Sequence, residues 1–446
     1  MAGSYAWLTF AQAKTQLAQR LAADISTDNA FWKNAELGIR IQQALRQYNI
    51  LTQTWKTDFQ FVNSGPGVWS SLATLAGSPR IRTITDSYCY TDMEYHLLEP
   101  PTAGVWSGTN QFTISDLSQA LQRRRDEMLI VSACNDVLVT GIPSTPAVSR
   151  ILMPDNTLDV PRLRFIPVDA TNNAGVTLYR DDAVALEFYE APLYELPPQM
   201  PQTYSLSSEP PLSFDVFPPP NVAGTYEGIV LQSGLPFVPP VPTLIGIPDD
   251  LAFVLEYGAL GDLFGRESES TDRERADYCT KRYLDGLILM QKTPWIMLGK
   301  VNGAAVSVDA LASVDRYDVD WDSNPTGFGP VVVTAGMDML ASPVNSSTGV
   351  TCLASAPVPV LDTDFIQCSR SSWDAVLDLA QASCLLKEGG AEWKAGLELE
   401  QRAIQFCASE NSRLKSTGAF ADVFLQRGQL EDMNQQRYNS KADQKG

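Results

Sequence analysis

Thirteen of the 29 prolines in this chain of 446 residues lie between Pro192 and Pro242. Proline has no backbone N–H, so it interrupts helices and is confined to edge strands, bulges and loops in a sheet. From Val148 onward, stretches such as SRILMP, LDVPRLRFIPV and VALEFYEAP alternate with a period close to two, which is typical of strands. We therefore predict a β-rich, Pro-rich region over 136–248, made of loops and edge strands rather than a central sheet.

An N-terminal helical region with a β insertion is expected over 1–135. Thr9 to Gln12 forms a T-x-x-Q capping box ahead of apolar residues at helical spacing, which predicts a first helix. Two further helices are predicted by apolar stripes. The second helix has Leu37, Ile41, Ala44, Tyr48, Leu51 and Trp55, and the third has Leu117, Leu121, Met128 and Val131. Between 59 and 112 the pattern favours strands and loops, with a short helix near 93–98.

The stretch IPDDLAFVLEYGALGDLFG restores the helical period, and a second helix follows after a short polar connection. Thr271 to Glu274 forms a T-x-x-E capping box for this second helix. We predict an αα-hairpin over 249–292 that is a packing scaffold, in which Gly258 and Ala259 allow close approach. The inward residues that we single out are Leu251, Leu255, Cys279, Tyr283 and Leu287, extended by Ala276 and Met290. The charged residues expected to project the other way are Asp272, Glu274, Lys281, Arg282 and Asp285.

A second β-rich region is expected over 293–370, with PWIMLGKV and GPVVVTAGMDML as candidate strands. Two helices and a tail are expected over 371–446, and Gly389 and Gly390 separate the helices because glycine suits a helix C-terminus. The final 20 residues are polar and are expected to be disordered when the chain is alone. The predicted fold class is α+β: a helical bundle with hairpins, Pro-rich and β-rich insertions, and extended C-terminal helices with a tail.

Charge and composition exclude several functional classes. Lys and Arg number 33 against 52 Asp and Glu, and the net charge of −19 makes a poor surface for gripping nucleic acid. No apolar run is long enough to span a membrane, and the N-terminus lacks the pattern of a secretory signal. The seven cysteines are scattered and form no C-x-x-C pair, which predicts mostly buried thiols from a reducing cytosol.

No motif assembles a catalytic, cofactor or metal site, so we expect a protein that is not an enzyme and uses no cofactor. His96 is the single histidine, and the absence of a G-x-S-x-G elbow indicates that it packs rather than catalyses. Asp320 begins a D-x-D-x-N pattern, but Pro325 and Val331 stand where a calcium loop needs Gly and Glu, which favours a solvated acidic loop.

Arg123–Arg125 could grip phosphate, but Asp126 and Glu127 follow directly. A charged helix face or an ion pair at a subunit interface is the better interpretation. A pair of carboxylates for glycoside hydrolysis stays open, because 52 acidic residues make any such pair unremarkable.

Four features follow one another between Arg180 and Gln291. The Pro-rich segment LSFDVFPPP precedes the strand-like GTYEGIVLQ, then LIGIPDDLAFVLEYGALGDLF opens a helix and RADYCTKRYLDGL closes the set. In this order they resemble the head-to-tail adaptor (neck connector) proteins of tailed bacteriophages. The helix pair at 8–55 is also similar to the N-terminal helices of such adaptors. The resemblance ends near Trp295 and leaves the role of the later residues open.

This resemblance implies a structural virion protein of the neck or tail, made in the host cytoplasm. Such adaptors form a ring below the portal, usually a dodecamer, that extends the DNA channel to the tail. The implied partners are the portal protein, tail nozzle or tail fibre proteins, and further copies in a homo-oligomeric ring, which needs a heterologous interface. DNA would be passing cargo repelled by acidic lumen residues, and no membrane is involved.

Three other classes stay open: a tail nozzle or tail-tube component, a virion-associated cell-wall hydrolase, and a host-binding fibre or spike. A tube protein is expected to be richer in strand repeats, and a spike needs long repetitive β segments. A hydrolase is expected to hold a carboxylate of raised pKa in a cleft.

The C-terminal tail from Ala419 is a candidate docking element for the portal. Its apolar cluster is Phe420, Val423, Phe424 and Leu425, which an isolated monomer is expected to have difficulty burying. The polar remainder has too few apolar groups to offset its ordering entropy, so a partner surface has to compensate. The alternative is that Phe420 and Phe424 cap the preceding helices within the same subunit.

Overall fold

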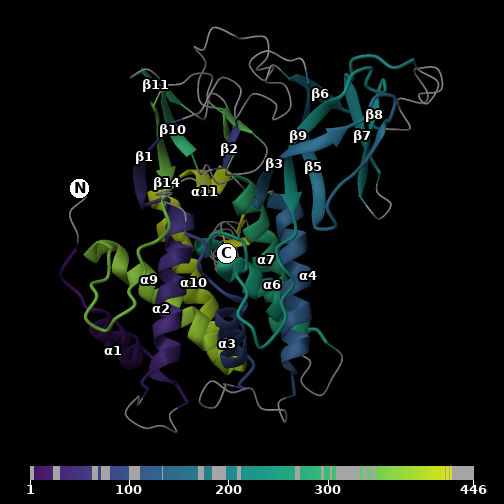
Figure 1. Cartoon of the computed structure of the whole chain (residues 1–446). Coiled ribbons are helices and arrows are strands. Elements are labelled where there is room, and N and C mark those ends of the chain that lie inside the picture. The colour runs from purple at the N-terminus through teal and green to yellow at the C-terminus, as the bar shows by residue number, and fades with distance from the viewer. Residues whose placement is uncertain are drawn as a thin grey trace, which may run out of the picture.

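The computed structural model combines a helical body with β-sheets at one end of it (Figure 1), so the predicted α+β class is confirmed. The residues that the structure describes are 5–23, 31–62, 69–71, 81–99, 111–132, 134–168, 175–182, 197–207, 212–266, 272–292, 296–301, 304–307, 332–334, 339–341, 347–416, 418–420 and 422–423.

The helical body is built from segments spread over the whole sequence. Its elements are α1 (Phe10–Arg20), α2 (Asn34–Thr52), α3 (Asp86–His96), α4 (Ile114–Ser132), the 3-10 turn η4 (Asp249–Leu251), α6 (Ala252–Phe264), α7 (Arg273–Lys292), α9 (Arg370–Glu388), α10 (Gly390–Glu410) and α11 (Arg413–Ser416). In Figure 1 the longer helices lie side by side below the sheets.

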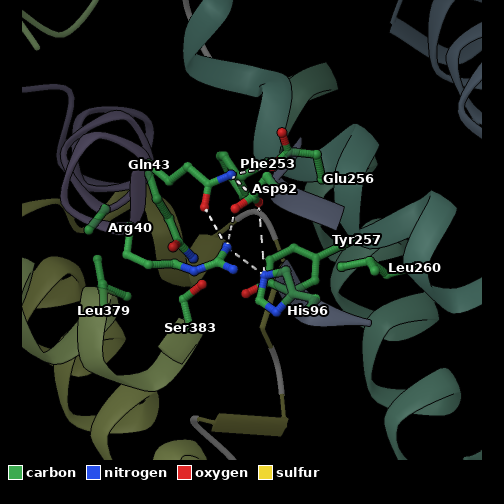
Figure 2. A pocket seen from close by; sticks show the side chains of 12 residues that line it. Arg40, Gln43, Asp92, His96, Phe253, Glu256, Tyr257, Leu260, Leu379 and Ser383 are labelled. Atoms are coloured by element: carbon green, nitrogen blue, oxygen red, sulfur yellow. Dashed lines mark hydrogen bonds and ion pairs between the residues drawn. The ribbon is translucent and has the colours of Figure 1, made fainter. Parts of the chain in front are cut away.

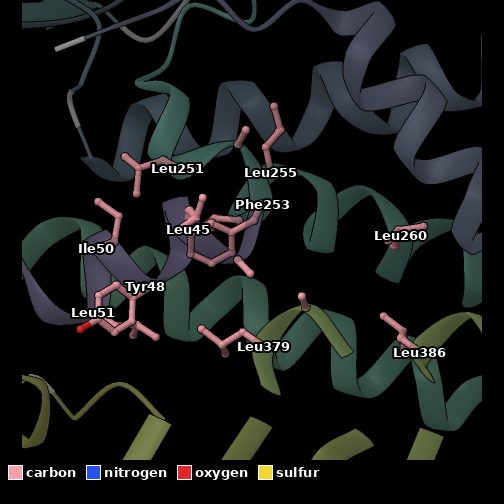
Figure 3. Close-up of a cluster of buried hydrophobic side chains, with 14 of the residues drawn as sticks. Leu45, Tyr48, Ile50, Leu51, Leu251, Phe253, Leu255, Leu260, Leu379 and Leu386 are labelled. Atoms are coloured by element: carbon pink, nitrogen blue, oxygen red, sulfur yellow. The ribbon is translucent and has the colours of Figure 1, made fainter. Parts of the chain in front are cut away.

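One hydrophobic core joins these helices. It contains buried residues from α1, α2, α3, α4, α6, α7, α9 and α10. Figure 3 shows its centre, where Leu45 and Tyr48 of α2 lie among Leu251, Phe253 and Leu379. Burying each such side chain contributes about 1.5–3 kcal/mol, so the helices of distant segments stabilise one another.

The expected early helices are present, with shifted boundaries. Thr9 caps α1 as predicted, with both hydrogen bonds of the capping box formed. Helix α2 buries the predicted stripe as far as Leu51 and ends at Thr52. Gln53 follows with a left-handed φ of 56°, so Trp55 lies beyond the helix and packs on Tyr48. Helix α3 begins at Asp86, whereas the sequence predicted a start at Met93.

The predicted hairpin is confirmed as packing scaffold. Helices α6 and α7 pack against each other, and all the inward residues singled out are buried: Leu251, Leu255, Ala276, Cys279, Tyr283, Leu287 and Met290. A Cβ added at Gly258 would lie 2.7 Å from the Tyr283 ring, so the close approach depends on this glycine. Thr271 of the expected capping box lies outside the described residues; Asp272 accepts the capping hydrogen bond from the Arg275 amide at 3.1 Å.

The Pro-rich region contributes more sheet than the sequence suggested. The largest sheet has the order β3-β9-β5-β6-β7-β8-β4 and is nearly closed. Its strands are β3 (Asp136–Ser144), β4 (Arg150–Leu152), β5 (Thr157–Pro167), β6 (Val176–Arg180), β7 (Thr203–Ser207), β8 (Ser213–Phe217) and β9 (Gly224–Gln232). Strand β9 is internal and largely buried, so the expectation of loops and edge strands is wrong for this part of the region.

The prolines next to this sheet are compatible with it because they stand at its margins or where the strand pairing is interrupted. Pro201 precedes β7, and Pro218 to Pro220 directly follow β8. Pro161, inside β5, falls where the pairing with β9 shifts register between Asp159 and Arg162. A residue at such a shift need not donate to the ladder. The stretch VALEFYEAP lies outside the described residues.

Two smaller sheets come from the expected second β-rich region together with early strands. One has the order β1-β14-β10-β11 and the other β12-β13-β2. Their strands are β1 (Lys56–Val62), β2 (Trp69–Ser71), β10 (Ile296–Val301), β11 (Ala304–Ser307), β12 (Val332–Thr334), β13 (Met339–Ala341) and β14 (Ser347–Leu353). Farther along the chain, Gly389 and Gly390 separate α9 from α10 as predicted, with φ of 72° and 58°.

Candidate functional site

Buried polar side chains from α2, α3, α6 and α9 meet inside the helical body, as Figure 2 shows for most of them. Helix α2 packs against α1, α3, α9, α10 and η4, so its polar positions are buried along with its apolar stripe. Residues one turn apart on a helix share a face, and both α2 and α3 use this spacing to aim polar groups inward. The buried polar network consists of Glu36, Arg40, Gln43, Asp92, His96, Glu256 and Lys387.

Arg40 is fully buried at the centre of this network. Its Nη1 donates to Asp92 Oδ1 and lies 2.7 Å from His96 Nε2. Its Nη2 lies 3.6 Å from Glu36 Oε1. Two carboxylates thus face one guanidinium, which is necessary because an unpaired buried charge would be strongly destabilising.

Gln43 connects Asp92 to Glu256. Its Nε2 donates to Asp92 Oδ2 at 2.7 Å and to Glu256 Oε2. Burial and the neighbouring Asp92 carboxylate raise the pKa of Glu256 well above its usual range. This shift favours the neutral form of Glu256, which avoids a second buried negative charge beside Asp92.

His96 is 3% exposed and lies against Arg40. Burial and the positive charge of Arg40 lower the pKa of His96 well below its usual range, so the imidazole is neutral. Arginine can only donate, so Nε2 is the acceptor and Nδ1 carries the proton. The packing role expected for His96 is confirmed.

The network ends at Lys387 on α9. Its Nζ lies 2.9 Å from Glu36 Oε2, donates to the Phe31 carbonyl at 3.0 Å and sits 4.7 Å from the Trp32 ring centre. Burial lowers the pKa of Lys387, and the Glu36 carboxylate opposes this effect. Lys387 thereby ties the segment before α2 to the end of α9.

A cavity of about 20 Å³ lies beside these side chains, lined among others by Arg40, Gln43, His96 and Glu256. This volume suits about one water molecule and leaves no room for a substrate. The network combines paired charges, a neutral acid and a neutral histidine, all removed from solvent. It can hold four helices in one arrangement, and it offers a substrate neither a nucleophile nor an accessible base.

A second buried cluster corrects the expected outward projection of α7 charges for Arg282 and Asp285, whereas the Glu274 and Lys281 side chains, 70% and 44% exposed, do project outward as predicted. Arg282 and Asp285 are 4% and 8% exposed. Arg282 Nη2 lies 3.3 Å from Glu400 of α10, and Nη1 lies 3.2 Å from Asp285 and 3.7 Å from Asp422. Tyr278 donates to the same Glu400 carboxylate at 2.7 Å. Arg282 is buried because Glu400 of α10 and Phe420 and Asp422 of the following segment lie against it.

The same cluster places the candidate docking residues. Phe420 and Val423 are each 1% exposed and belong to the helical core, with the Arg282 guanidinium 5.0 Å from the Phe420 ring centre. The expectation that an isolated chain has difficulty burying them is therefore wrong for these two residues. Phe424, Leu425 and the polar tail lie outside the described residues.

The Arg123–Arg125 run forms ion pairs and hydrogen bonds within the chain, although the Arg123 side chain is 66% exposed as expected for a charged helix face. Arg124 makes a bidentate pair with Asp262 of α6 at 2.9 and 2.5 Å, and Arg123 also contacts Asp262. Arg125 is fully buried and donates to the carbonyls of Leu235 and Gly234 at 2.8 and 3.1 Å. The ion pairs expected at a subunit interface thus form within one chain, between α4 and α6.

The two aspartates of the IPDD motif, Asp249 and Asp250, accept hydrogen bonds from other segments of the chain. Asp249 accepts from the amides of Thr83 and Ile84 at 2.7 and 3.0 Å. Asp250 accepts from Asn49 at 2.6 Å and from the Ala356 amide at 3.0 Å. Burial raises the pKa of Asp250 to about 6, although these hydrogen bonds oppose the shift. The motif thus joins α6 to α2 and to two distant loops.

Sequence reasoning missed the buried polar network because it assigned polar helix positions to the outside. The spacing of Glu36 and Arg40, and of Asp92 and His96, is i,i+4 and was available as a signal. That spacing occurs equally on solvated helix faces. The sequence does not indicate that other helices pack around nearly every side of α2.

Among the described residues, no group of three or more His, Cys, Asp or Glu side chains is placed to hold a metal ion. The acidic pattern at Asp320 lies outside those residues. All seven cysteines are buried without disulfides, as the sequence predicted. In the part of the chain that the structure describes, each helix is too short or too polar to cross a bilayer.

The chain matches no family model, and it matches none of the curated protein sequences.

Proposed function

We propose that this chain is a head-to-tail adaptor of a tailed bacteriophage, a structural and non-catalytic protein that forms a ring below the portal. The observation that carries the proposal is the packing of the motifs behind the resemblance. Strand β9, helix α6 and helix α7 each pack on α4. Features that follow one another in the sequence therefore lie together in the fold, as expected of one assembly module.

The interior of the helical body also supports this role. The buried polar network and the Arg282 cluster fix helices from both ends of the chain relative to each other. A rigid subunit loses less conformational entropy on association, which favours ring assembly. The net charge of −19 suits the wall of a DNA passage, because acidic groups repel phosphate.

The proposed partners are the portal protein, tail nozzle or tail fibre proteins, and further copies of the chain in a dodecameric ring, with DNA as passing cargo. The proposed location is the neck of a virion, after synthesis in the host cytoplasm. Residues beyond Val423, including Phe424 and Leu425, are proposed to dock on the portal.

Negative-stain microscopy of the full-length protein mixed with portal particles tests this proposal. We expect a ring of added density on one face of the portal, absent when an unrelated acidic protein of similar size replaces the chain. Bare portals in the presence of excess folded protein would contradict the adaptor role.

The nearly closed seven-stranded sheet favours a second candidate, a tail nozzle or tail-tube component. The same images separate the two, because a nozzle binds particles that already carry an adaptor and leaves bare portals unchanged. A cell-wall hydrolase is the third candidate, and clearing of a peptidoglycan gel by the purified protein would replace both structural proposals.

A further inference from the structure

An exposed apolar turn stands out on the flank of the body beside α4. The turn spans 238–242 and closes with a hydrogen bond from the Val241 amide to the Val238 carbonyl at 3.1 Å. Val238, Pro240, Val241 and Pro242 are all exposed, Val238 by 60% and Val241 by 64%. Exposed apolar groups gathered in this way indicate a contact surface. We call residues 238–242 the proline turn.

The proline turn is held firmly on both sides. Before it, the Phe237 amide donates to Gln122 at 3.2 Å, and the Arg125 guanidinium lies 4.1 Å from the Phe237 ring centre. After it, the Thr243 amide donates to Asp86 at 2.8 Å. The buried Arg125 therefore helps to hold the turn in one conformation. A turn that is ordered before binding loses less conformational entropy when a partner binds.

A second exposed apolar surface lies at the α1 side of the body. It consists of Tyr5, Val360, Leu361 and Phe365, which are 45%, 74%, 63% and 41% exposed, and we call it the N-terminal patch. Main-chain hydrogen bonds from Phe10 to Asp364 at 2.8 Å and from Ile366 to Leu8 at 2.9 Å fix it against the start of α1. In Figure 1, α1 and α4 lie on different flanks of the helical body.

We propose that the proline turn of one copy docks on the N-terminal patch of the next copy. Two different surfaces on different flanks make a head-to-tail contact, the type that closes into a ring. Charge favours a second copy as the occupant: the chain carries −19, so copies repel except where charge is absent. Residues 233–248 and 350–361 contain no charged residue. Two carboxylates stand at the patch: Asp362 is paired with Lys14 at 2.6 Å, and Asp364 accepts from the amides of Val360 and Leu361 at 2.8 and 2.7 Å.

The composition of the two surfaces is also complementary. Interface centres are depleted of charge and enriched in aromatic residues. The N-terminal patch provides two aromatic rings, Tyr5 and Phe365, and the proline turn provides valine and proline side chains. The inference rests on the proposed ring, since it names the surfaces by which subunits of that ring would meet.

Cross-linking of full-length variants with a bismaleimide tests the contact, with and without portal particles. The native thiols are all buried, so thiols introduced at exposed positions react selectively. A chain with both Val241→Cys and Leu361→Cys is expected to give a ladder of covalent oligomers. A mixture of the two single variants is expected to give a dimer of one of each and nothing larger. The matched control pairs Leu361→Cys with Leu152→Cys, a residue of β4 that is 64% exposed.

Each result decides the inference separately from the proposed function. A ladder no stronger than that of the control, with or without portal, overturns the contact. So does a self-linked dimer of Val241→Cys alone, because that means a two-fold interface. A ladder without portal binding keeps the contact and removes the adaptor function. Rings on portals without a ladder keep the adaptor function and overturn these surfaces.

Discussion

Two carboxyl groups of the buried polar network are expected to respond in opposite ways to the same chemical change. Asp92 is the partner of Arg40, whereas the raised pKa of Glu256 favours its neutral form. We therefore expect conversion to the amide to remove a charge at Asp92 and to leave the charge at position 256 unchanged. Asp92→Asn and Glu256→Gln form a matched pair of variants at neighbouring positions of one network.

The magnitude for Asp92→Asn follows from its contacts. Its two oxygens accept from Arg40 Nη1 and Gln43 Nε2, so an amide turns one acceptor into a donor that faces a donor. Removing one partner of a buried pair costs about 3–5 kcal/mol. Because Glu36 still lies 3.6 Å from Arg40 in this variant, the guanidinium keeps one carboxylate partner. We therefore expect a loss of unfolding free energy near the lower value, about 3 kcal/mol.

Glu256→Gln keeps an acceptor for Gln43 and replaces the acid proton with an amide donor. Its expected loss is below about 1 kcal/mol, the size of one altered neutral hydrogen bond. Urea unfolding at pH 7, followed by far-UV circular dichroism, measures both changes in unfolding free energy. Equal losses, or a larger loss for Glu256→Gln, would refute the assignment of charge within the network.

Three further outcomes are expected. Gly286→Ala should destabilise the protein by about 1–3 kcal/mol despite the better helix propensity of alanine, because the new Cβ would lie 2.5 Å from Val254 Cγ1; adding Val254→Ala should restore part of the loss in thermal unfolding. The pKa of Asp250 in the folded protein, about 6, exceeds its value in the unfolded chain, so Asp250 contributes its full stabilisation below about pH 4 and loses it as the pH rises through 6. The expected fall in the free energy of unfolding is roughly 3 kcal/mol, and Asp250→Asn should abolish this pH dependence in urea unfolding. A chain ending at residue 423 keeps the buried Phe420 and Val423, so it should unfold like the full chain but fail to bind portal. A chain ending at 418 should lose roughly 3–5 kcal/mol with the burial of Phe420 and Val423. Normal portal binding by the chain that ends at 423 would remove the docking proposal.

The elements with strong local signals were predictable. The capping box at Thr9, the hairpin stripe through Cys279 and Tyr283, and the glycine break at Gly389 and Gly390 each depend on residues within a few positions of one another. Local spacing determines which face of a helix is apolar and where a helix stops. Such features can be predicted without knowing which segment packs against the helix.

The candidate site could not be predicted in the same way. Arg40 meets Asp92 from 52 positions away, and Glu36 meets Lys387 from 351 positions away. Arg282 looked like part of a solvated face until α10 and the segment at 420–423 covered it. Whether a charged side chain is buried depends on which helix packs over it. The residues next to that side chain in the sequence do not indicate which helix this is.

The sequence by itself determined the α+β class, most of the helices, the packing hairpin and the acidic surface. Periodicity and net charge depend on composition and local spacing alone. The tertiary structure decided that β9 is an internal strand, that Phe420 and Val423 are core residues, and that the charges of α2, α3 and α7 are paired inside the body. These outcomes rest on contacts between segments far apart in the chain, because burial and charge pairing are set by the partners that the fold brings together.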